Sequence, residues 1–348
     1  MRIALDATYS VDPHPSGIAI YSRELLLGLA RLFPQNQFLH YYRVKQFKNA
    51  SAPESPNVRR RLLLPPVPAF GADLFHALNQ RVDRRPAPKV VSTFHDLFVM
   101  TGEYSSPDFR ARFTRQARRA AQNSDFIVAV SEFTANQVRE LLGFDASRIR
   151  VVPHGVNAPI PEKFSAREEV ILFVGALQKR KNVARLVKAF ESQPAPWRLA
   201  LAGSPSGYGA ESILKQIEAS PCRDRIQVTG YLSQAELNDW YARASIFAFP
   251  SLDEGFGIPV LEAMAHGVPV ITSNRSALPE IAGDAAVLIN PEQTEELGEA
   301  LRRLIHDAEL RARLSERGLE RAKLYPWERA VRETYSVYCE LLGSAYCF

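Results

Sequence analysis

Short apolar runs alternate with amphipathic segments along the first half of the chain. The runs have the length and composition of buried strands and lie at residues 2–7, 38–42, 74–76, 90–94 and 126–130. Between them, leucines at helical spacing predict a helix over 20–32, and an arginine-rich helix is expected over 107–123. Ser131 is a suitable cap for a further helix that starts near Phe133. This alternation predicts a parallel sheet covered by helices on both faces.

The same pattern restarts after a proline-rich junction. Pro153, Pro159 and Pro161 mark a loop. Apolar runs then recur at 170–174, 197–202, 226–228, 246–249 and 268–271, with helical stretches between them. A chain of 348 residues is longer than one hydrophobic core usually supports. We therefore predict an α/β protein with two doubly wound domains joined near 155–165, whose ligand lies in a cleft at the carboxyl ends of the strands.

The strongest chemical signal is the segment 253–269, which follows a predicted strand. Gly255 and Gly257 let backbone N–H groups approach a ligand closely, because neither carries a Cβ. Pro259 suits the first turn of a helix. Residues 255–258 would then present N–H groups at a helix N-terminus, where phosphate or sugar hydroxyls can bind.

Two glutamates flank these glycines. Glu254 precedes the predicted helix, and Glu262 lies about one turn inside it. One carboxylate can therefore take sugar hydroxyls while the other reaches a ribose diol. The simpler alternative is a glycine-rich turn with a surface glutamate.

A second motif, residues 173–182, again has the order strand, glycine turn and helix. Gly175 ends the strand, and Lys179, Arg180 and Lys181 follow it. Three adjacent cations just beyond a strand can neutralise a diphosphate as it becomes a leaving group. The alternative for such a charge run is the solvated start of a helix.

Shorter pieces of chemical interest lie in the first half and at the junction. Ser16 and Gly17 end the first loop and open a helix, which gives another terminus suited to anions. His95 directly follows the strand 90–94, where its imidazole can hydrogen-bond a sugar or phosphate oxygen. A structural histidine is the alternative at this position. Residues 153–156 stand at the domain junction.

Several different chemistries lack their sequence signatures. The first strand is not followed by G-x-G-x-x-G, and the chain contains no P-loop and no G-x-S-x-G. Metal-ligand spacings such as H-x-x-x-H and D-x-D are also absent, so we expect no metal and no cofactor. The arginines at 110, 112, 115, 118 and 119 lack interleaved aromatic residues and a recognised module, which argues against a nucleic-acid partner.

Charge and cysteine content bear on the compartment. Residues 1–160 carry 21 Lys and Arg against 13 Asp and Glu, which suits an anionic phospholipid surface or a lipid-linked phosphate, or else marks a solvated face. No run approaches the ~20 apolar residues that span a membrane, and Asp6 comes too early for a secretory signal. Cys222, Cys339 and Cys347 are odd in number, which argues against a disulfide framework. We expect a reduced cytoplasmic protein, either free or peripheral on the inner face of the membrane.

Together these residues resemble the family 4 glycosyltransferases (GT4), and the resemblance spans nearly the whole chain. It rests on the Glu-x7-Glu pattern within 254–269, on 175–182, on 153–156, and on His95-Asp96 followed by 130–134. The family has the GT-B fold, with two Rossmann-like domains facing each other across a cleft that holds the active site. Its members retain the anomeric configuration of the sugar and need no metal.

The resemblance implies limits for both domains. The N-terminal, acceptor-binding domain would comprise 1–157, and the nucleotide-sugar-binding domain would comprise 158–326. Residues 326–330 resemble the start of the family's last helix, so a helix over 327–348 would pack back onto the first domain.

The resemblance also implies roles for the site residues. Glu254 would bind donor-sugar hydroxyls, and Glu262 would hold the ribose. Arg180 and Lys181 would bind the diphosphate, and His95 would lie near the sugar and the β-phosphate. The remaining donor contacts, several of them through backbone atoms, would come from Gly17, Gly175, Gly230, Tyr231, Leu232, Gly255, Phe256, Gly257 and Ile258.

One departure from the family pattern bears on the donor. Many members carry arginine directly after the glycine of the second-domain motif, whereas this chain has Ala176. The form Gly-x-Leu-x-x-Arg-Lys-Asn resembles a mannosyltransferase subgroup, which makes GDP-mannose the preferred donor and UDP-sugars the second choice. We expect a glycan or lipid-linked acceptor in cell-envelope polysaccharide or glycolipid synthesis. Two rival functions stay open, namely a sugar-nucleotide epimerase of the same fold and an inactive nucleotide-sugar-binding subunit.

Overall fold

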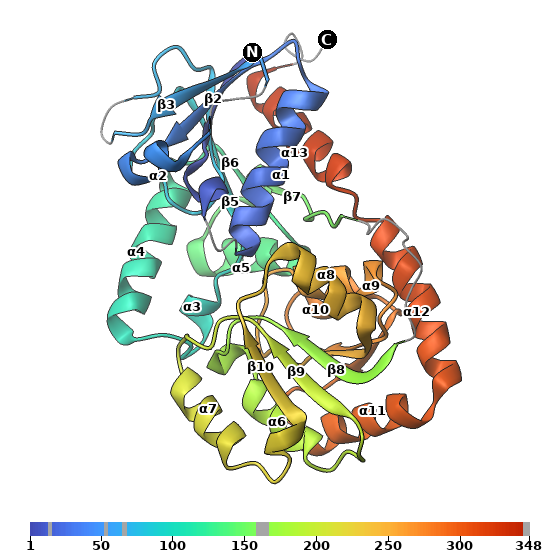
Figure 1. The fold of residues 1–348 in the computed structure, drawn as a ribbon. Helices are drawn as coiled ribbons and strands as arrows, with labels where there is room; N and C mark the ends of the chain where they lie inside the picture. Colours follow the sequence, from blue (N-terminus) through green and yellow to red (C-terminus); the bar gives the residue numbers. More distant parts are fainter. Residues whose placement is uncertain (13–15, 52–54, 65–67, 158–166, 344–348) are drawn as a thin grey trace. The chain divides into compact units, whose positions relative to one another are not determined.

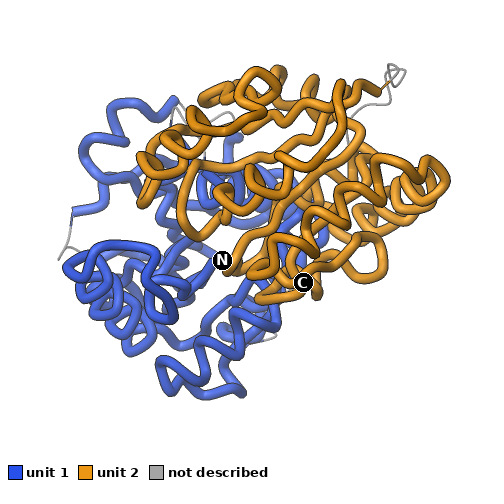
Figure 2. The backbone as a smooth tube through the Cα atoms, turned by 90° about the horizontal axis from the view of Figure 1, so that it is seen from below, with its two compact units in different colours: residues 1–155, 327–348 blue, residues 156–326 orange. Residues whose placement is uncertain are grey.

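The computed structural model divides the chain into two compact units, which are coloured separately in Figure 2. Unit 1 comprises Met1–Gly155 and Trp327–Phe348, and unit 2 comprises Val156–Pro326. The structure describes residues 1–12, 16–51, 55–64, 68–157 and 167–343. The first segment of unit 1 ends at Gly155, two residues before the domain limit expected from the sequence. Most of the predicted junction lies outside the described residues.

Within the described residues, unit 1 is built on a seven-stranded parallel sheet of order β3-β2-β1-β4-β5-β6-β7 (Figure 1). Its strands are β1 (Arg2–Asp6), β2 (Gln37–Tyr42), β3 (Val58–Leu62), β4 (Leu74–Ala77), β5 (Lys89–Phe94), β6 (Phe126–Ala129) and β7 (Ile149–Val151). The order of connection reverses between β1 and β4. This point is the topological switch of unit 1.

The helices of unit 1 cover this sheet. They are α1 (Gly17–Leu32), α2 (Val44–Asn49), α3 (Phe98–Thr101), α4 (Pro107–Asn123), α5 (Glu132–Leu142) and α13 (Trp327–Leu342). The C-terminal helix α13 packs on α1, and both contribute to one apolar core in which Leu25, Leu29 and Val331 are buried. The last helix in sequence therefore completes the fold of the first unit.

Unit 2 repeats the architecture with six parallel strands in the part of the chain described, in the order β10-β9-β8-β11-β12-β13. Its strands are β8 (Glu168–Val174), β9 (Arg198–Ala202), β10 (Ile226–Gly230), β11 (Ala244–Phe249), β12 (Val270–Ser273) and β13 (Ala286–Ile289). Its helices are α6 (Val183–Phe190), α7 (Ala210–Glu218), α8 (Gln234–Arg243), α9 (Ile258–Ala265), α10 (Leu278–Ala282), α11 (Thr294–His306) and α12 (Ala308–Lys323). The switch point of this sheet lies between β8 and β11.

Two further expectations can be compared with the structure. Cys339 on α13 is disulfide-bonded, so the expectation of reduced cysteines is wrong at this position, whereas Cys222 is free. The odd number of cysteines excludes complete pairing but not a single bond. Over the described ranges, no helix has both the length and the apolar character needed to cross a membrane.

Candidate functional site

The two motifs of unit 2 meet beside its switch point. Strand β8 runs into Gly175 and then the 3₁₀ turn Lys179–Lys181, while its neighbour β11 runs into the segment 250–257 that precedes α9. Leu252 N–H donates a hydrogen bond of 2.8 Å to the carbonyl of Arg180, which ties the two segments together. Ligands of doubly wound sheets bind at this place, beyond the carboxyl ends of the strands on either side of the switch.

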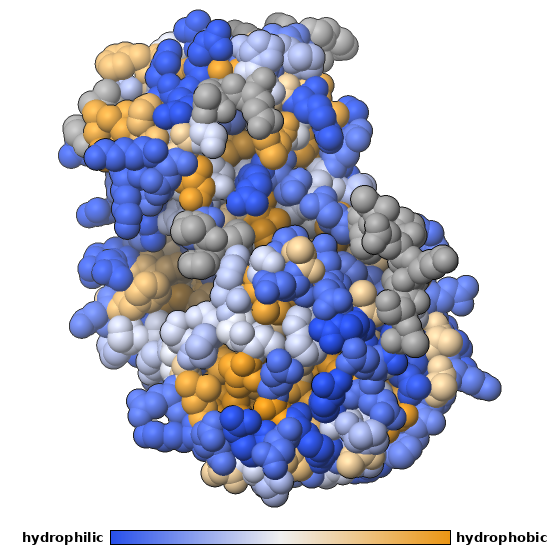
Figure 3. All heavy atoms as spheres, viewed as in Figure 1, coloured by the Kyte–Doolittle hydropathy of each residue, from blue (hydrophilic) through white to orange (hydrophobic). Residues whose placement is uncertain are grey.

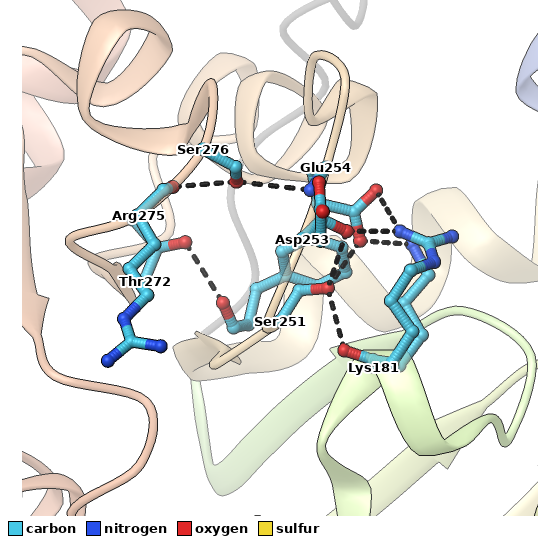
Figure 4. Close-up of polar contacts among 9 residues, drawn as sticks. Lys181, Ser251, Asp253, Glu254, Thr272, Arg275 and Ser276 are labelled. Atoms are coloured by element: carbon cyan, nitrogen blue, oxygen red, sulfur yellow. Dashed lines mark hydrogen bonds and ion pairs between the residues drawn. The ribbon is translucent and has the colours of Figure 1, made fainter. Parts of the chain in front are cut away.

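A buried ion cluster forms the centre of this site (Figure 4). Arg180 Nη1 lies 2.8 Å from one carboxylate oxygen of Glu254, and Lys181 Nζ lies 2.6 Å from the other. Ser251 Oγ donates a third bond to the oxygen that Lys181 contacts. The side chains of Arg180, Lys181 and Glu254 are only 10%, 13% and 10% exposed, so this is a desolvated cluster rather than a surface ion pair.

The charge state of Glu254 follows from these contacts. Burial alone would raise the pKa of its carboxyl, but the charges of Arg180 and Lys181, with the hydrogen bonds from Lys181 and Ser251, lower that pKa to about 2. Glu254 is therefore an ionised group that only accepts hydrogen bonds, as a partner of sugar hydroxyls must. The two cations carry the charge that a diphosphate needs.

The backbone of Glu254 is held as firmly as its side chain. Its N–H donates to Ser276 Oγ at 3.0 Å, as Figure 4 shows, and its carbonyl accepts from the N–H of Ala277 at 3.2 Å. Both partners immediately precede α10. The loop after β11 is thus held by the protein's own hydrogen bonds, which is the preorganisation that charge stabilisation requires.

The glycines after Glu254 shape the start of α9. Gly257 caps this helix with φ +117°, and a Cβ there would come within 2.8 Å of Leu278 Cδ2, so both conformation and space require glycine. Pro259 lies in the first turn, as predicted. Phe256 is buried and its ring lies edge-on to Tyr325, with the two ring centres 6.1 Å apart. Its side chain therefore belongs to the core of unit 2.

Glu262 lies on α9 and is tied to a residue that the sequence does not single out. The Tyr241 hydroxyl, from α8, donates to Glu262 Oε2 at 3.0 Å. Burial raises the pKa of Glu262, and this hydrogen bond opposes that rise. The Tyr241 ring stacks on His266, whose Nδ1 donates to the Glu262 carbonyl at 2.7 Å. No sequence spacing relates residue 241 to residue 262, because the contact joins two different helices.

Asn182 and Gly230, which both have positive φ, follow strands β8 and β10 at the carboxyl edge of the same sheet. Asn182 has φ 60°, and its Nδ2 donates to the carbonyls of Pro250 and Pro291 at 3.0 and 2.6 Å. Gly230 ends β10 with φ +75°, and its carbonyl accepts from the N–H of Gly203 at 2.9 Å. Tyr231 and Leu232 follow, and Tyr231 is 43% exposed. The candidate nucleobase segment 230–232 therefore lies at the same sheet edge as the ion cluster, and its Tyr231 is exposed to solvent.

In unit 1, His95 follows β5 and is 6% exposed. Its Nε2 lies 2.8 Å from the carbonyl of Leu78, which can only accept, so Nε2 carries the proton. Its Nδ1 lies 3.2 Å from Nε2 of His154, the residue that the sequence places at the junction. Burial lowers the pKa of His95 to about 4, so the imidazole is neutral at physiological pH. Gly17 is the exposed first residue of α1.

Two family models match consecutive parts of the chain. Residues 17–158 match the family described as Glycosyltransferase Family 4, and residues 158–321 match the family described as Glycosyl transferases group 1. The two matches adjoin and together span nearly the whole chain. The chain belongs to the family 4 glycosyltransferases.

Relatives of this glycosyltransferase include the O-antigen chain mannosyltransferase B of Escherichia coli, which is 28% identical over 95% of this chain and 98% of its own length. Among solved structures, the sucrose-phosphate synthase of Thermosynechococcus elongatus matches with a TM-score of 0.80 at 22% identity, over 99% of this chain and 100% of that one. Anabaena HepE, solved in complex with UDP and glucose, matches with a TM-score of 0.74 at 18% identity, over 98% and 99% of the two chains. The fold is therefore GT-B.

In this glycosyltransferase the predicted donor residues of unit 2 do gather at one sheet edge. Arg180, Lys181 and Glu254 are in direct contact, and residues 255–258 continue from Glu254 into α9. His95 and Gly17 belong to unit 1 and are not part of this group. Among the residues the structure describes, no group of three or more His, Cys, Asp or Glu side chains is arranged to hold a metal ion. The absence of a metal requirement stays a prediction.

Proposed function

We propose that this glycosyltransferase transfers mannose from GDP-mannose to a saccharide acceptor, with retention of anomeric configuration and without a metal ion. The observation that carries the proposal is the buried cluster of Arg180, Lys181 and Glu254 beside the switch point of unit 2. Two desolvated cations can take the place of a metal in neutralising a diphosphate.

Donor binding exchanges one set of partners for another. The diphosphate oxygens take over Lys181 and Arg180, and the N–H groups at the start of α9 add further donors. Glu254 is then released to accept from sugar hydroxyls, while Glu262 accepts from the ribose diol. Residues 230–232 contact the base. Gly17 adds helix N-terminal charge from unit 1.

The chemical step is a front-side displacement. The bond between the anomeric carbon and the phosphate oxygen breaks, and its electron pair stays on the β-phosphate, where Lys181 and Arg180 stabilise it. The acceptor oxygen bonds to the same face of the anomeric carbon, and its proton passes to the departing phosphate oxygen. His95 is neutral and donates its Nε2–H to Leu78, so it supplies no proton to this step.

The identity of the sugar rests on two observations. The Arg180-Lys181-Asn182 form of the motif and the E. coli mannosyltransferase relative both favour mannose, and that relative's name points to O-antigen, a cell-surface polysaccharide. The structural neighbour HepE binds UDP and glucose, which favours a UDP-sugar as the second candidate.

We also propose a peripheral contact with anionic membrane through α4. Arg112, Arg115, Arg118 and Arg119 of this helix are exposed, as is 41% of Phe109. Hydrophilic residues gather over α4 on the face in Figure 3. A basic helix with an exposed aromatic ring suits an anionic surface. Co-sedimentation with phosphatidylglycerol vesicles but not with phosphatidylcholine vesicles is expected, and equal sedimentation with both would refute the contact.

Thermal unfolding with a panel of GDP- and UDP-sugars tests the donor. A ligand that binds only the folded state raises the melting temperature, by an amount set by its concentration relative to Kd. GDP-mannose should raise it most. A larger rise in melting temperature with UDP-glucose would indicate a UDP-sugar donor. No rise with any nucleotide sugar of the panel would refute the proposed donor site. Analysis of products without an acceptor separates transfer from epimerase activity.

A further inference from the structure

The switch point of unit 1 has its own set of polar residues, which the donor site does not use. The chain leaving β1 forms the turn Thr8–Val11, and the chain leaving the neighbouring strand β4 continues through Leu78 to Arg81. These two segments meet, because the guanidinium of Arg81 lies 5.4 Å above the ring centre of Tyr9. A doubly wound sheet binds its ligand at this place.

Asn79 and Gln80, which follow β4, are buried polar residues without adequate partners. Asn79 is 3% exposed, and neither its Nδ2 nor its Oδ1 has a hydrogen-bond partner in the described part of the chain. Gln80 is 8% exposed, and its Oε1 likewise has none there. A buried amide without partners destabilises the folded state, so its presence needs a reason. Binding of a ligand by the Asn79 amide would therefore break no existing hydrogen bond of its side chain.

The surrounding groups indicate the kind of ligand. Asp6 ends β1 at 1% exposure, and its carboxylate accepts from the N–H and the hydroxyl of Thr8. Burial raises the pKa of Asp6, and the charges of Arg43 and Arg81 act in the opposite direction, so both arginines lie near it. Two side-chain amides, a carboxylate, guanidinium groups and one aromatic ring form a set that suits vicinal hydroxyls and the apolar face of a sugar.

The position of this set relative to His95 is fixed within unit 1. Leu78, which accepts the Nε2–H of His95, is the residue before Asn79. A sugar held by Asn79 therefore lies next to the histidine assigned to the reacting region. We propose that Asn79 and Gln80 bind hydroxyls of the terminal hexose of the acceptor at the switch point of unit 1. This inference rests on the proposed function, since it takes transfer to a saccharide as given.

The test compares two leucine substitutions in the full chain. Asn79→Leu removes the amide without partners and keeps a side chain of similar size. Asn57→Leu is the matched control, because Asn57 precedes β3 at the opposite, amino edge of the same sheet and its Nδ2 donates to the carbonyl of Ala30 at 3.1 Å. The probe is methyl α-D-mannopyranoside, titrated with and without GDP and followed by NMR, and GDP-mannose is titrated separately.

For Asn79→Leu we expect affinity for the mannoside to fall about tenfold or more, affinity for GDP-mannose to stay at the wild-type value, and the melting temperature to stay level or rise. For Asn57→Leu we expect a lower melting temperature and unchanged affinity for both ligands. The inference is overturned if the wild-type chain does not bind the mannoside, if Asn79→Leu binds it normally, or if Asn79→Leu lowers the melting temperature as the control does. Failure of the wild type to bind GDP-mannose counts against the proposed donor alone, because the mannoside titration without GDP is independent of it.

Discussion

At the scale of single residues, the ion cluster is the main finding in unit 2. The sequence predicts Arg180, Lys181 and Glu254 as site residues from their positions after two strands, and the structure places all three in contact. The contact itself could not be predicted, because Lys181 and Glu254 are 73 residues apart in the chain and only the strand order makes them neighbours. For the same reason the sequence does not reveal Tyr241, whose contact with Glu262 joins two helices, or the contact of His154 with His95.

The two lysines of the Lys-Arg-Lys run offer a matched pair of substitutions. Lys181→Ala should lower turnover by about 10²–10³-fold, because it removes a fixed charge from the leaving diphosphate. Glu254 keeps Arg180 and Ser251 as partners, so the protein should stay folded. Lys179 is exposed and lies outside the ion cluster, so Lys179→Ala should remain near wild-type turnover. Steady-state rates with GDP-mannose measure the turnover of both variants. Equal losses of turnover in the two would refute the charge role assigned to Lys181.

Tyr241→Phe tests the role of Glu262. Loss of the hydroxyl leaves Glu262 without the bond that orients its carboxylate, so affinity for GDP should fall by about tenfold, the usual effect of one hydrogen bond to a charged group. The same substitution should leave the affinity for 2′,3′-dideoxy-GDP unchanged, because that nucleotide has no diol to bind. Calorimetric titration of both nucleotides gives the comparison. A loss of equal size for the two would mean that Tyr241 acts on the fold and not on the ribose.

At the scale of elements, most strands and helices of both sheets follow from apolar runs and their spacing. The helix over 107–123 is observed with the predicted bounds, and α1 starts three residues earlier than predicted, at Gly17. The apolar runs do not predict strands β3, β7 and β13. β3 is an edge strand in which arginines occupy three of five positions, and β7 has only three residues. β13 is a four-residue run that only its pairing with β12 identifies as a strand.

The start of α9 gives a prediction at this scale. Gly257→Ala should destabilise the chain by more than about 1 kcal/mol and weaken GDP binding, because the new Cβ meets Leu278 and the positive φ disfavours alanine. Gly298 lies inside α11, where a Cβ would meet nothing closer than 3.8 Å. Gly298→Ala should therefore stabilise the chain by up to about 1 kcal/mol. Urea unfolding measures both, and a stable Gly257→Ala variant that binds GDP normally would contradict the described helix start.

At the scale of the whole molecule, the buried histidines of unit 1 set a pH dependence. Burial lowers the pKa of His40 and His95 to about 4 and that of His76 to about 3, below the usual 6.5. Between pH 4 and pH 6.5 the folded chain binds fewer protons than the unfolded chain. The free energy of unfolding is therefore fully present above pH 6.5 and falls as the pH drops toward 4.

Urea midpoints at about pH 7, 5.5 and 4.5 measure this slope. His40 Nε2 has no hydrogen-bond partner among the described residues, so His40→Gln removes one titrating group at small structural cost. The variant should show a shallower loss of stability with acid than the wild type. A wild-type midpoint that does not change over this pH range would contradict the buried, neutral state of these side chains.

Under the proposed function, a cluster in unit 2 stabilises GDP without a metal as it leaves from the same face that the acceptor attacks. The most direct measurement is the NMR spectrum of the product formed from GDP-α-D-mannose and methyl α-D-mannopyranoside, with EDTA present throughout. The proposed front-side displacement predicts an α-linked mannoside. A β-linked product, or turnover that EDTA abolishes and a divalent cation restores, would contradict it.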